Sequence, residues 1–182
     1  TATVGTNTTQ LATTAFVLAN AGGGGGLVPI SKTVITGPPY PTAVDIDVSS
    51  YDTILIRIWR LDVTTYSTMQ LRTSNDGGAT FSTSNYRYHL QNNITGTNTP
   101  LYASGSSQSS ILLTNDGDEL NGFISISRHF DSVISWDINN ENESFKGVGS
   151  SNSSITDIRL FPNTGQLTRG DIHVYGYAEG GA

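Results

Sequence analysis

The strongest constraint on the fold is a two-residue alternation of apolar and polar side chains that recurs from residue 44 onward. In residues 54–59 the isoleucines at even positions alternate with Leu55, Arg57 and Trp59. Side chains two positions apart share one face of a β-strand, so each run predicts a strand with one face in a core. The runs are residues 44–48, 54–59, 69–72, 124–127, 134–138, 158–160 and 172–175.

The segments between these runs are rich in residues that favour turns. Examples are Gly-Pro-Pro at 37–39, Asn-Asp-Gly-Gly at 75–78 and Pro-Asn-Thr-Gly at 162–165. Glycine permits a positive φ, proline fixes φ, and Asn and Asp bond to their own backbone. Many short alternating strands with such turns predict an all-β fold, an antiparallel β-sandwich of jelly-roll-like form. The Ser/Gly/Asn-rich residues 95–110 predict a long surface loop.

Five consecutive glycines, residues 22–26, divide the chain into two parts. Glycine loses much backbone entropy on ordering, so this run predicts a linker. Before it, residues 8–21 carry apolar side chains at helical spacing, and so short a helix is marginal alone in water. We therefore predict an N-terminal helix and Gly-rich linker in residues 1–26, and a β-sandwich tip domain in residues 27–182.

Composition and charge exclude several kinds of partner. Charged residues make up 13% of the chain and its formal net charge is −6. No nucleic-acid partner is expected, because a phosphate backbone requires clustered Lys and Arg. Cysteine is absent, which excludes disulfides and thiolate metal sites. An apolar run of about 18 residues and a basic leader are also missing, so neither membrane insertion nor a signal peptide is expected.

One pattern predicts a β-hairpin turn that is anchored by a carboxylate. Ser74, Asp76, Gly78, Thr80 and Phe81 fit the Asp-box pattern S-x-D-x-G-x-T-(W/F). In such a turn the carboxylate accepts hydrogen bonds from turn amides, so we interpret Asp76 as a turn stabiliser rather than a calcium or sugar contact. Sialidase propellers carry one Asp box per blade, whereas this chain has a single copy, which weakens the case for a glycan-cleaving enzyme.

The sequence contains no clear catalytic or metal-binding constellation. His89, His129 and His173 occur singly, without the spacing of zinc sites. No serine lies in a G-x-S-x-G motif, and nothing selects a carboxylate pair for glycoside hydrolysis. Residues 115–119 are rich in oxygen ligands but lack the EF-hand spacing, which favours a solvated turn over a Ca²⁺ site. We expect a protein that is not an enzyme, with no catalytic residue, metal or cofactor.

Five aromatic side chains are candidates for receptor contact. Tyr86 and Tyr88 share one face of a predicted strand, Tyr175 and Tyr177 share a face of another, and Trp59 lies opposite the isoleucine face of its own strand. Aromatic side chains combine a large apolar area with a polar group, which suits sugar stacking and protein interfaces. The alternative, that they fill a buried sheet face or a subunit contact, stays open.

Several short motifs, taken in their order along the chain, resemble one protein family. ATTAFV at residues 12–17 resembles a recurrent segment of tail-fibre proteins from tailed bacteriophages. The pair Tyr51-Asp52, the Asp-Gly-Gly turn with its Tyr-rich strand, and the closing GDIHVYG at residues 170–176 together resemble a domain of phage virion proteins. Together the motifs cover most of the chain, and their order is stronger evidence than any one of them.

The resemblance implies a homotrimeric fibre or receptor-binding protein on the surface of the phage virion. Its tip domain would bind host cell-surface polysaccharide, and its N-terminus would join other virion proteins. A short helix that needs partners suits a three-helix bundle, and trimerisation would let weak sugar contacts add up. Two alternatives stay open: a structural decoration or connector protein of the virion, and a glycan-cleaving enzyme, which has the least support.

Overall fold

A computed structural model describes most of the predicted tip domain, and its regular structure is all β. The residues that it describes are 26–64, 67–94, 101–114, 119–128, 132–151 and 154–178. Over these ranges the chain forms twelve strands and no helix, and every strand pairing is antiparallel. The predicted all-β antiparallel fold is confirmed, whereas the predicted N-terminal helix lies outside the described residues.

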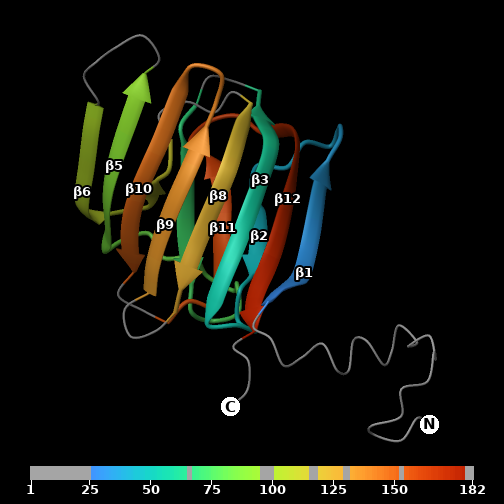
Figure 1. The fold of residues 1–182 in the computed structure, drawn as a ribbon, viewed down its shortest axis with the longest axis vertical. Coiled ribbons are helices and arrows are strands. Elements are labelled where there is room, and N and C mark those ends of the chain that lie inside the picture. The colour runs from blue at the N-terminus through green and yellow to red at the C-terminus, as the bar shows by residue number, and fades with distance from the viewer. Residues whose placement is uncertain are drawn as a thin grey trace, which may run out of the picture.

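The strands form two sheets (Figure 1). The eight-stranded sheet has the order β1 (Gly26–Ile35), β12 (Leu167–Ala178), β3 (Thr53–Val63), β8 (Leu120–Ser127), β9 (Ser132–Asn139), β10 (Glu143–Ser151), β5 (Tyr86–Ile94) and β6 (Leu101–Gln108). The four-stranded sheet has the order β2 (Val44–Asp47), β11 (Asp157–Pro162), β4 (Met69–Ser74) and β7 (Ile111–Leu112). The first strand begins at the last of the five glycines.

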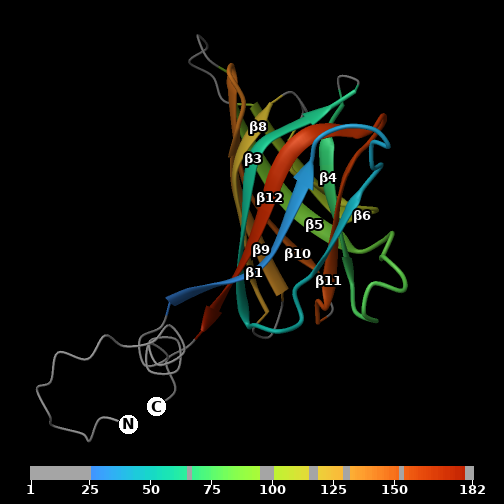
Figure 2. The same ribbon diagram turned by 90° about the vertical axis from the view of Figure 1, so that its right-hand side faces the viewer.

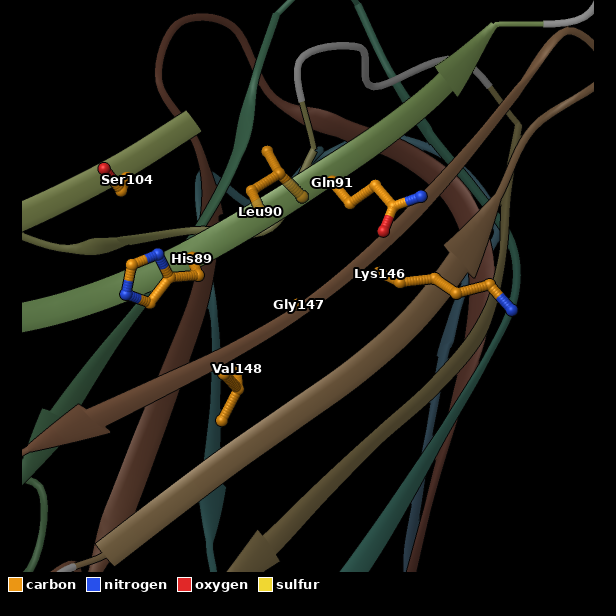
Figure 3. A pocket seen from close by; sticks show the side chains of 7 residues that line it. All are labelled: His89, Leu90, Gln91, Ser104, Lys146, Gly147 and Val148. Atoms are coloured by element: carbon orange, nitrogen blue, oxygen red, sulfur yellow. The ribbon is translucent and has the colours of Figure 1, made fainter. Parts of the chain in front are cut away.

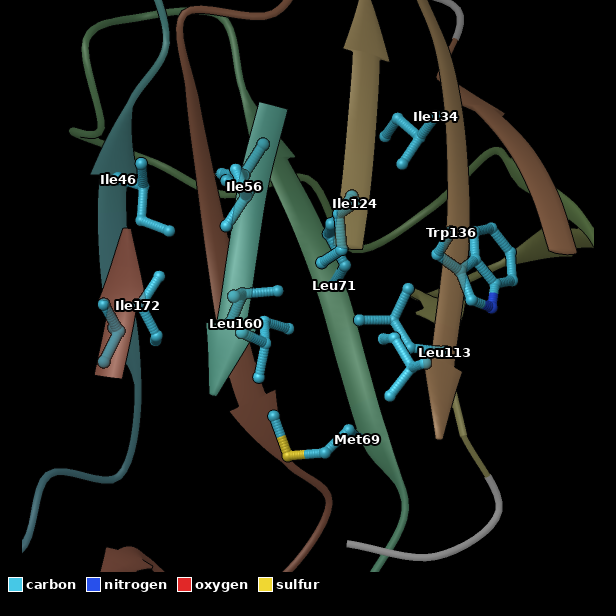
Figure 4. Close-up of a cluster of buried hydrophobic side chains, with 14 of the residues drawn as sticks. Ile46, Ile56, Met69, Leu71, Leu113, Ile124, Ile134, Trp136, Leu160 and Ile172 are labelled. Carbon is cyan, nitrogen blue, oxygen red and sulfur yellow. The ribbon is translucent and has the colours of Figure 1, made fainter. Parts of the chain in front are cut away.

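The two sheets lie face to face as layers and share one apolar core (Figure 2 and Figure 4). Ile46 and Leu71 of the four-stranded sheet pack with Ile56, Ile124 and Trp136 of the eight-stranded sheet, and each is at most 4% exposed. Removing this apolar surface from water is the main force that holds the layers together. Each alternating run predicted from the sequence contributes a strand, and its apolar side is buried.

The Asp-Gly-Gly turn does not close a hairpin, which corrects the prediction. Strand β4 before the turn pairs with β11 and β7, whereas β5 after the turn pairs with β10 and β6. Residues 75–85 therefore carry the chain from one sheet to the other. A tight turn reverses the chain in both cases, so turn chemistry alone does not distinguish a hairpin from a passage between layers.

Four strands have no apolar alternation that would have predicted them. Residues 95–110 were expected to be a loop, yet β6 lies within them and pairs with β5 at the edge of the larger sheet. Strands β1, β7 and β10 were missed in the same way. Serine and glycine are frequent in β6 and β10, and sheet pairing uses backbone groups that every non-proline residue provides.

A β-bulge in β3 explains why Leu61 is buried although Trp59, two residues earlier, is exposed. Ile58 points into the core and Trp59 points outward, but Leu61 points into the core again. Arg60, between them, has a φ of 52°, and the register with β12 and β8 shifts at this point. An extra residue in one strand reverses the direction of the side chains that follow. Trp59 therefore stays on the outside while Leu61 fills the core.

Gly147 in β10 makes room for a core tryptophan. A Cβ at this position would overlap the Trp136 ring and lie 2.5 Å from the His89 carbonyl oxygen. We expect Gly147→Ala to lower the free energy of unfolding by about 1–3 kcal/mol, the usual cost of overpacking a core. Urea denaturation measures this loss, and Ser144→Ala on the same strand is the control. An unchanged unfolding midpoint for Gly147→Ala would contradict the packing described.

Candidate functional site

The candidate site is the outer face of the eight-stranded sheet, defined as the side turned away from the core. Cross-strand pairs arrange its side chains in rows. One row contains Lys32, His173, Arg57, Phe123, Asp137, Lys146 and Gln91. The adjacent row contains Pro29, Tyr175, Leu55, Ser125, Ser135, Val148 and His89.

Large apolar side chains that are exposed gather on this outer face. Each of them is between 43% and 54% exposed: Leu27, Val34, Trp59, Phe123, Val133, Val148 and Tyr177. They come from strands far apart in sequence, and Leu27 and Tyr177 are direct cross-strand partners. Apolar groups gathered on one surface mark a site of interaction with a ligand or another protein.

The first hollow on the outer face is lined by aromatic and polar side chains from β3, β8 and β9. Its volume is about 280 Å³, and its lining includes Arg57, Trp59, Asn121, Phe123, Asp137 and Asn139. The guanidinium carbon of Arg57 lies 5.0 Å from the centroid of the Trp59 ring, which is cation–π geometry. Two exposed aromatic rings beside amide and carboxylate groups can hold a ligand with both apolar and hydroxyl surfaces.

The second hollow lies further across the same face, on β10, β5 and β6 (Figure 3). Its volume is about 380 Å³, and its lining includes His89, Gln91, Ser104, Lys146 and Val148. The lining residues contain no carboxylate, and their polar side chains can all donate a hydrogen bond. This hollow is therefore suited to a ligand group that accepts hydrogen bonds.

An ion pair separates the two hollows. Asp137 lines the first hollow and Lys146 lines the second, and the Lys146 Nζ lies 2.8 Å from the Asp137 Oδ2. The side chains are 48% and 57% exposed, so water screens the pair and its net stabilisation is small. A ligand on this face can therefore compete for either partner.

Three of the five predicted contact residues lie on the outer face. Trp59 is 48% exposed and Tyr177 is 43% exposed, while Tyr175 is half-buried. The rings of Tyr175 and His173 stack with their centroids 6.4 Å apart. Trp59 lines the first hollow, whereas the two tyrosines lie on β12 beside β1. Sheet pairing therefore joins residues separated by more than a hundred positions into one surface.

Tyr86 and Tyr88 share a face as predicted, but that face is the inner one. Tyr86 is 1% exposed, and its hydroxyl accepts a hydrogen bond from the Thr73 N–H at 2.7 Å and donates to the Ser82 carbonyl at 3.1 Å. Tyr88 is half-buried and packs against the core. We therefore remove Tyr86 from the candidate contacts. Leu90, in phase with both tyrosines, was the signal in the sequence that this face points inward.

Sequence reasoning missed most of the polar residues that line the hollows. Phe123 had a usable signal, since it is out of phase with the buried Ile124. Arg57 was placed on the same face as Trp59 but was not named as a contact. Asn121 and Asp137 had no such signal, because they belong to the site only through the pairing of β8 with β3 and β9.

Asp76 anchors the passage between the two sheets. Its carboxylate accepts hydrogen bonds from the Ser74 hydroxyl at 2.6 Å, the Thr80 N–H at 2.9 Å and the Thr80 hydroxyl at 2.6 Å. The Ser74 oxygen in turn accepts from the Gly78 N–H at 3.0 Å. These bonds, first from Ser74 and then from Thr80, lower the pKa of Asp76 from 3.8 to about 2. The interpretation of Asp76 as a turn stabiliser fits this geometry.

We expect Asp76→Asn to lower the melting temperature at pH 7. Because the pKa of Asp76 is lowered on folding, its stabilisation is complete above pH 3.8 and is lost as the pH falls toward 2. The difference in melting temperature between wild type and variant should therefore shrink between pH 5 and pH 2. Thermal unfolding followed by circular dichroism measures it. A difference that stays constant over this range would contradict the role of the carboxylate.

Neither a metal-binding cluster nor a membrane-spanning helix occurs in the described ranges. No three His, Asp or Glu side chains there are close enough to hold a metal ion. No helix in the same ranges is long and apolar enough to cross a bilayer. Glu119 bonds to Arg60 and Arg169, while residues 115–118 and His129 lie outside the described part of the chain.

Comparisons with known proteins do not assign the chain to a family. No protein-family model matches it. No curated protein matches it significantly in sequence. The fold, the chemistry of the outer face and the sequence motifs therefore carry the functional proposal.

Proposed function

We propose that this protein is a fibre or receptor-binding protein of a tailed-bacteriophage virion, a homotrimer whose tip binds glycan on the host cell surface. The observation that carries the binding role is the first hollow, where Trp59 and Phe123 lie beside Arg57, Asn121 and Asp137. Aromatic rings cover the apolar face of a sugar, and amides and charged groups bond to its hydroxyls. Such a site binds without catalytic groups.

Two of the motifs behind the family resemblance contact each other in the fold. The ring of Tyr51 packs so closely against Gly176 that a Cβ at Gly176 would overlap it. Arg128 donates hydrogen bonds to the carbonyls of Ser49 and Tyr51, and its N–H donates to the Asp52 carbonyl at 2.9 Å. The Tyr-Asp pair and the closing Tyr-Gly strand therefore depend on each other, which supports treating them as one domain signature.

The proposed form of the tip is a jelly-roll-like sandwich. Strands β2, β4, β7 and β11 lie in the smaller sheet, whereas β3, β5, β8 and β12 lie in the larger one. The chain therefore passes repeatedly between layers, as it does in the Greek keys from which jelly rolls are built. Strands β1, β9 and β10 would then widen the larger sheet and enlarge its outer face.

The trimer is tested by the mass of the full chain in solution. We expect light scattering after size-exclusion chromatography to give three times the chain mass of 19.3 kDa. The physical reason is that a helix as short as the one predicted in residues 8–21 is stable only when it packs against partners. In a closed symmetric trimer every copy of the helix would have the same packing partners. A monomer that persists at high concentration would contradict the assembly.

Trp59 provides the test of glycan binding. We expect Trp59→Ala to weaken adsorption to host polysaccharide about tenfold, the effect of losing a central aromatic contact worth about 1.4 kcal/mol. Retention on immobilised polysaccharide measures the change. Phe161→Ala is the matched control, because Phe161 also lies beneath an arginine, Arg72, but on the smaller sheet. If both variants weaken adsorption equally, or if neither weakens it, the assignment of the outer face as the glycan-binding surface is contradicted.

The two alternative functions give different outcomes in the same assays. A structural connector would bind purified virion proteins and fail to adsorb to host cells. A glycan-cleaving enzyme would release new reducing ends from host polysaccharide. Adsorption that depends on Trp59 without release of reducing ends is the outcome expected of a receptor-binding protein.

A further inference from the structure

Positive charge exceeds negative charge on the outer face, although the chain as a whole is acidic with a formal net charge of −6. The permanently charged side chains in its paired rows are Lys32, Arg57, Arg87, Lys146 and Arg169, against Asp62, Asp137 and Asp171. The two histidines His89 and His173 lie in the same rows. Such a distribution favours ligands of negative charge.

The smaller sheet shows the opposite balance on its outward side. Asp45, Asp47 and Asp157 lie there, against Arg72 and Arg159. Arg159 is held by Asp45 through two hydrogen bonds of 2.7 Å, so its charge is already matched. The two outer surfaces therefore differ in charge, and the difference is a property of the fold rather than of any charged segment of the sequence.

Lys146 and His89 give the second hollow a specific preference for acidic groups. The Lys146 ammonium and the side chains of His89, Gln91 and Ser104 can all donate hydrogen bonds into it. Hydrogen bonds from charged donors to carboxylate or phosphate oxygens are about twice as strong as neutral ones. A neutral sugar has no carboxylate or phosphate oxygen and could not form these stronger hydrogen bonds.

The first and second hollows are positioned for consecutive parts of one extended ligand. The first is centred on β8 and the second on β5, three strands apart in the sheet order. With strands about 4.8 Å apart, the hollows are separated by roughly 14 Å. A ligand that fills both must be a chain of linked units rather than a single small molecule.

We propose that the ligand of this face is an acidic polysaccharide. A sugar ring lies between Trp59 and Phe123 in the first hollow, and a carboxylate or phosphate group further along the chain binds Lys146, whose ammonium points toward Asp137 and away from His89 (Figure 3). This inference rests on the proposed glycan-binding function and specifies the class of glycan. A second copy of the protein is a poorer occupant, because two such faces would bring like charges together.

The first test compares acidic polysaccharides with their neutral counterparts. The probes are immobilised polygalacturonate, alginate and hyaluronan, each also presented after chemical reduction of its carboxylates to alcohols. We expect the full-length protein to bind an acidic form at least fivefold more tightly than its reduced form, and to lose that preference as sodium chloride is raised from 50 to 500 mM.

Every other outcome of this comparison overturns the inference, and the outcomes differ in whether the proposed glycan-binding function is overturned as well. Equal binding to acidic and reduced polymers would overturn the requirement for acid but leave the glycan-binding function intact. No binding to any acidic polymer would overturn the inference, and failure to adsorb to host cells as well would overturn the proposed function. Equally tight binding to double-stranded DNA would show a general affinity for polyanions instead.

Substitutions of Lys146 and Asp137, the ion pair between the hollows, should change the affinity for acidic polymers in opposite directions. We expect Lys146→Gln to weaken acidic-polymer binding up to about fivefold, the limit for one exposed charge. Asp137→Asn should strengthen binding by a similar factor, because it removes a repelling carboxylate and releases Lys146. In a site for neutral sugar, replacing the charged carboxylate of Asp137 by an amide would weaken its hydrogen bonds to sugar hydroxyls, so weakening by Asp137→Asn overturns the inference.

Lys32→Gln is the matched control for the loss of charge. Lys32 lies on the same face, pairs with Asp171 at 3.3 Å, and lines neither hollow. Its substitution should change binding less than twofold. His89→Gln, which keeps a donor but removes the imidazole, is a second variant if Lys146→Gln does not fold. Equal effects of Lys32→Gln and Lys146→Gln would show that only overall charge matters, which overturns the assigned hollow.

Discussion

The structure depends above all on the isoleucine face of β3. Ile54, Ile56 and Ile58 are at most 2% exposed and lie in the core shared by the two sheets. Their strand lies inside the larger sheet, paired with β12 on one side and β8 on the other. Since side chains alternate along a strand, burying this face turns Arg57 and Trp59 outward. The same packing that stabilises the fold therefore positions the candidate site.

Three irregular positions, at Arg60, Asp76 and Gly147, allow backbone paths and close packing that regular strands do not allow. The bulge at Arg60 turns Leu61 into the core, although regular alternation after Trp59 would leave it outside. The carboxylate of Asp76 orders the passage between the sheets through local hydrogen bonds, without any contact to the outer face. Gly147 lets the β10 backbone lie against the ring of Trp136. These features serve folding, and they leave the outer face free for binding.

Much of the β-architecture was predictable, because alternation records which side of a strand meets apolar surroundings. The alternating apolar runs identified seven of the strands and their buried sides. Strands β6 and β10 were not predictable, because their pairing depends on backbone groups and neighbouring strands rather than on apolar side chains. The Asp-Gly-Gly turn was recognised, but its partners in space were not, so a passage between sheets was predicted as a hairpin.

The sequence by itself determined that the chain is a β-protein, that Trp59 lies opposite a buried face, and that Tyr175 and Tyr177 share a side. These are local facts set by the alternation of side chains along one strand. The tertiary structure alone decided that Asn121 and Asp137 line one hollow with Trp59 and that Lys146 lies beside this hollow. Such placements depend on which strands pair and in what register, and pairing is a long-range choice that no single segment encodes.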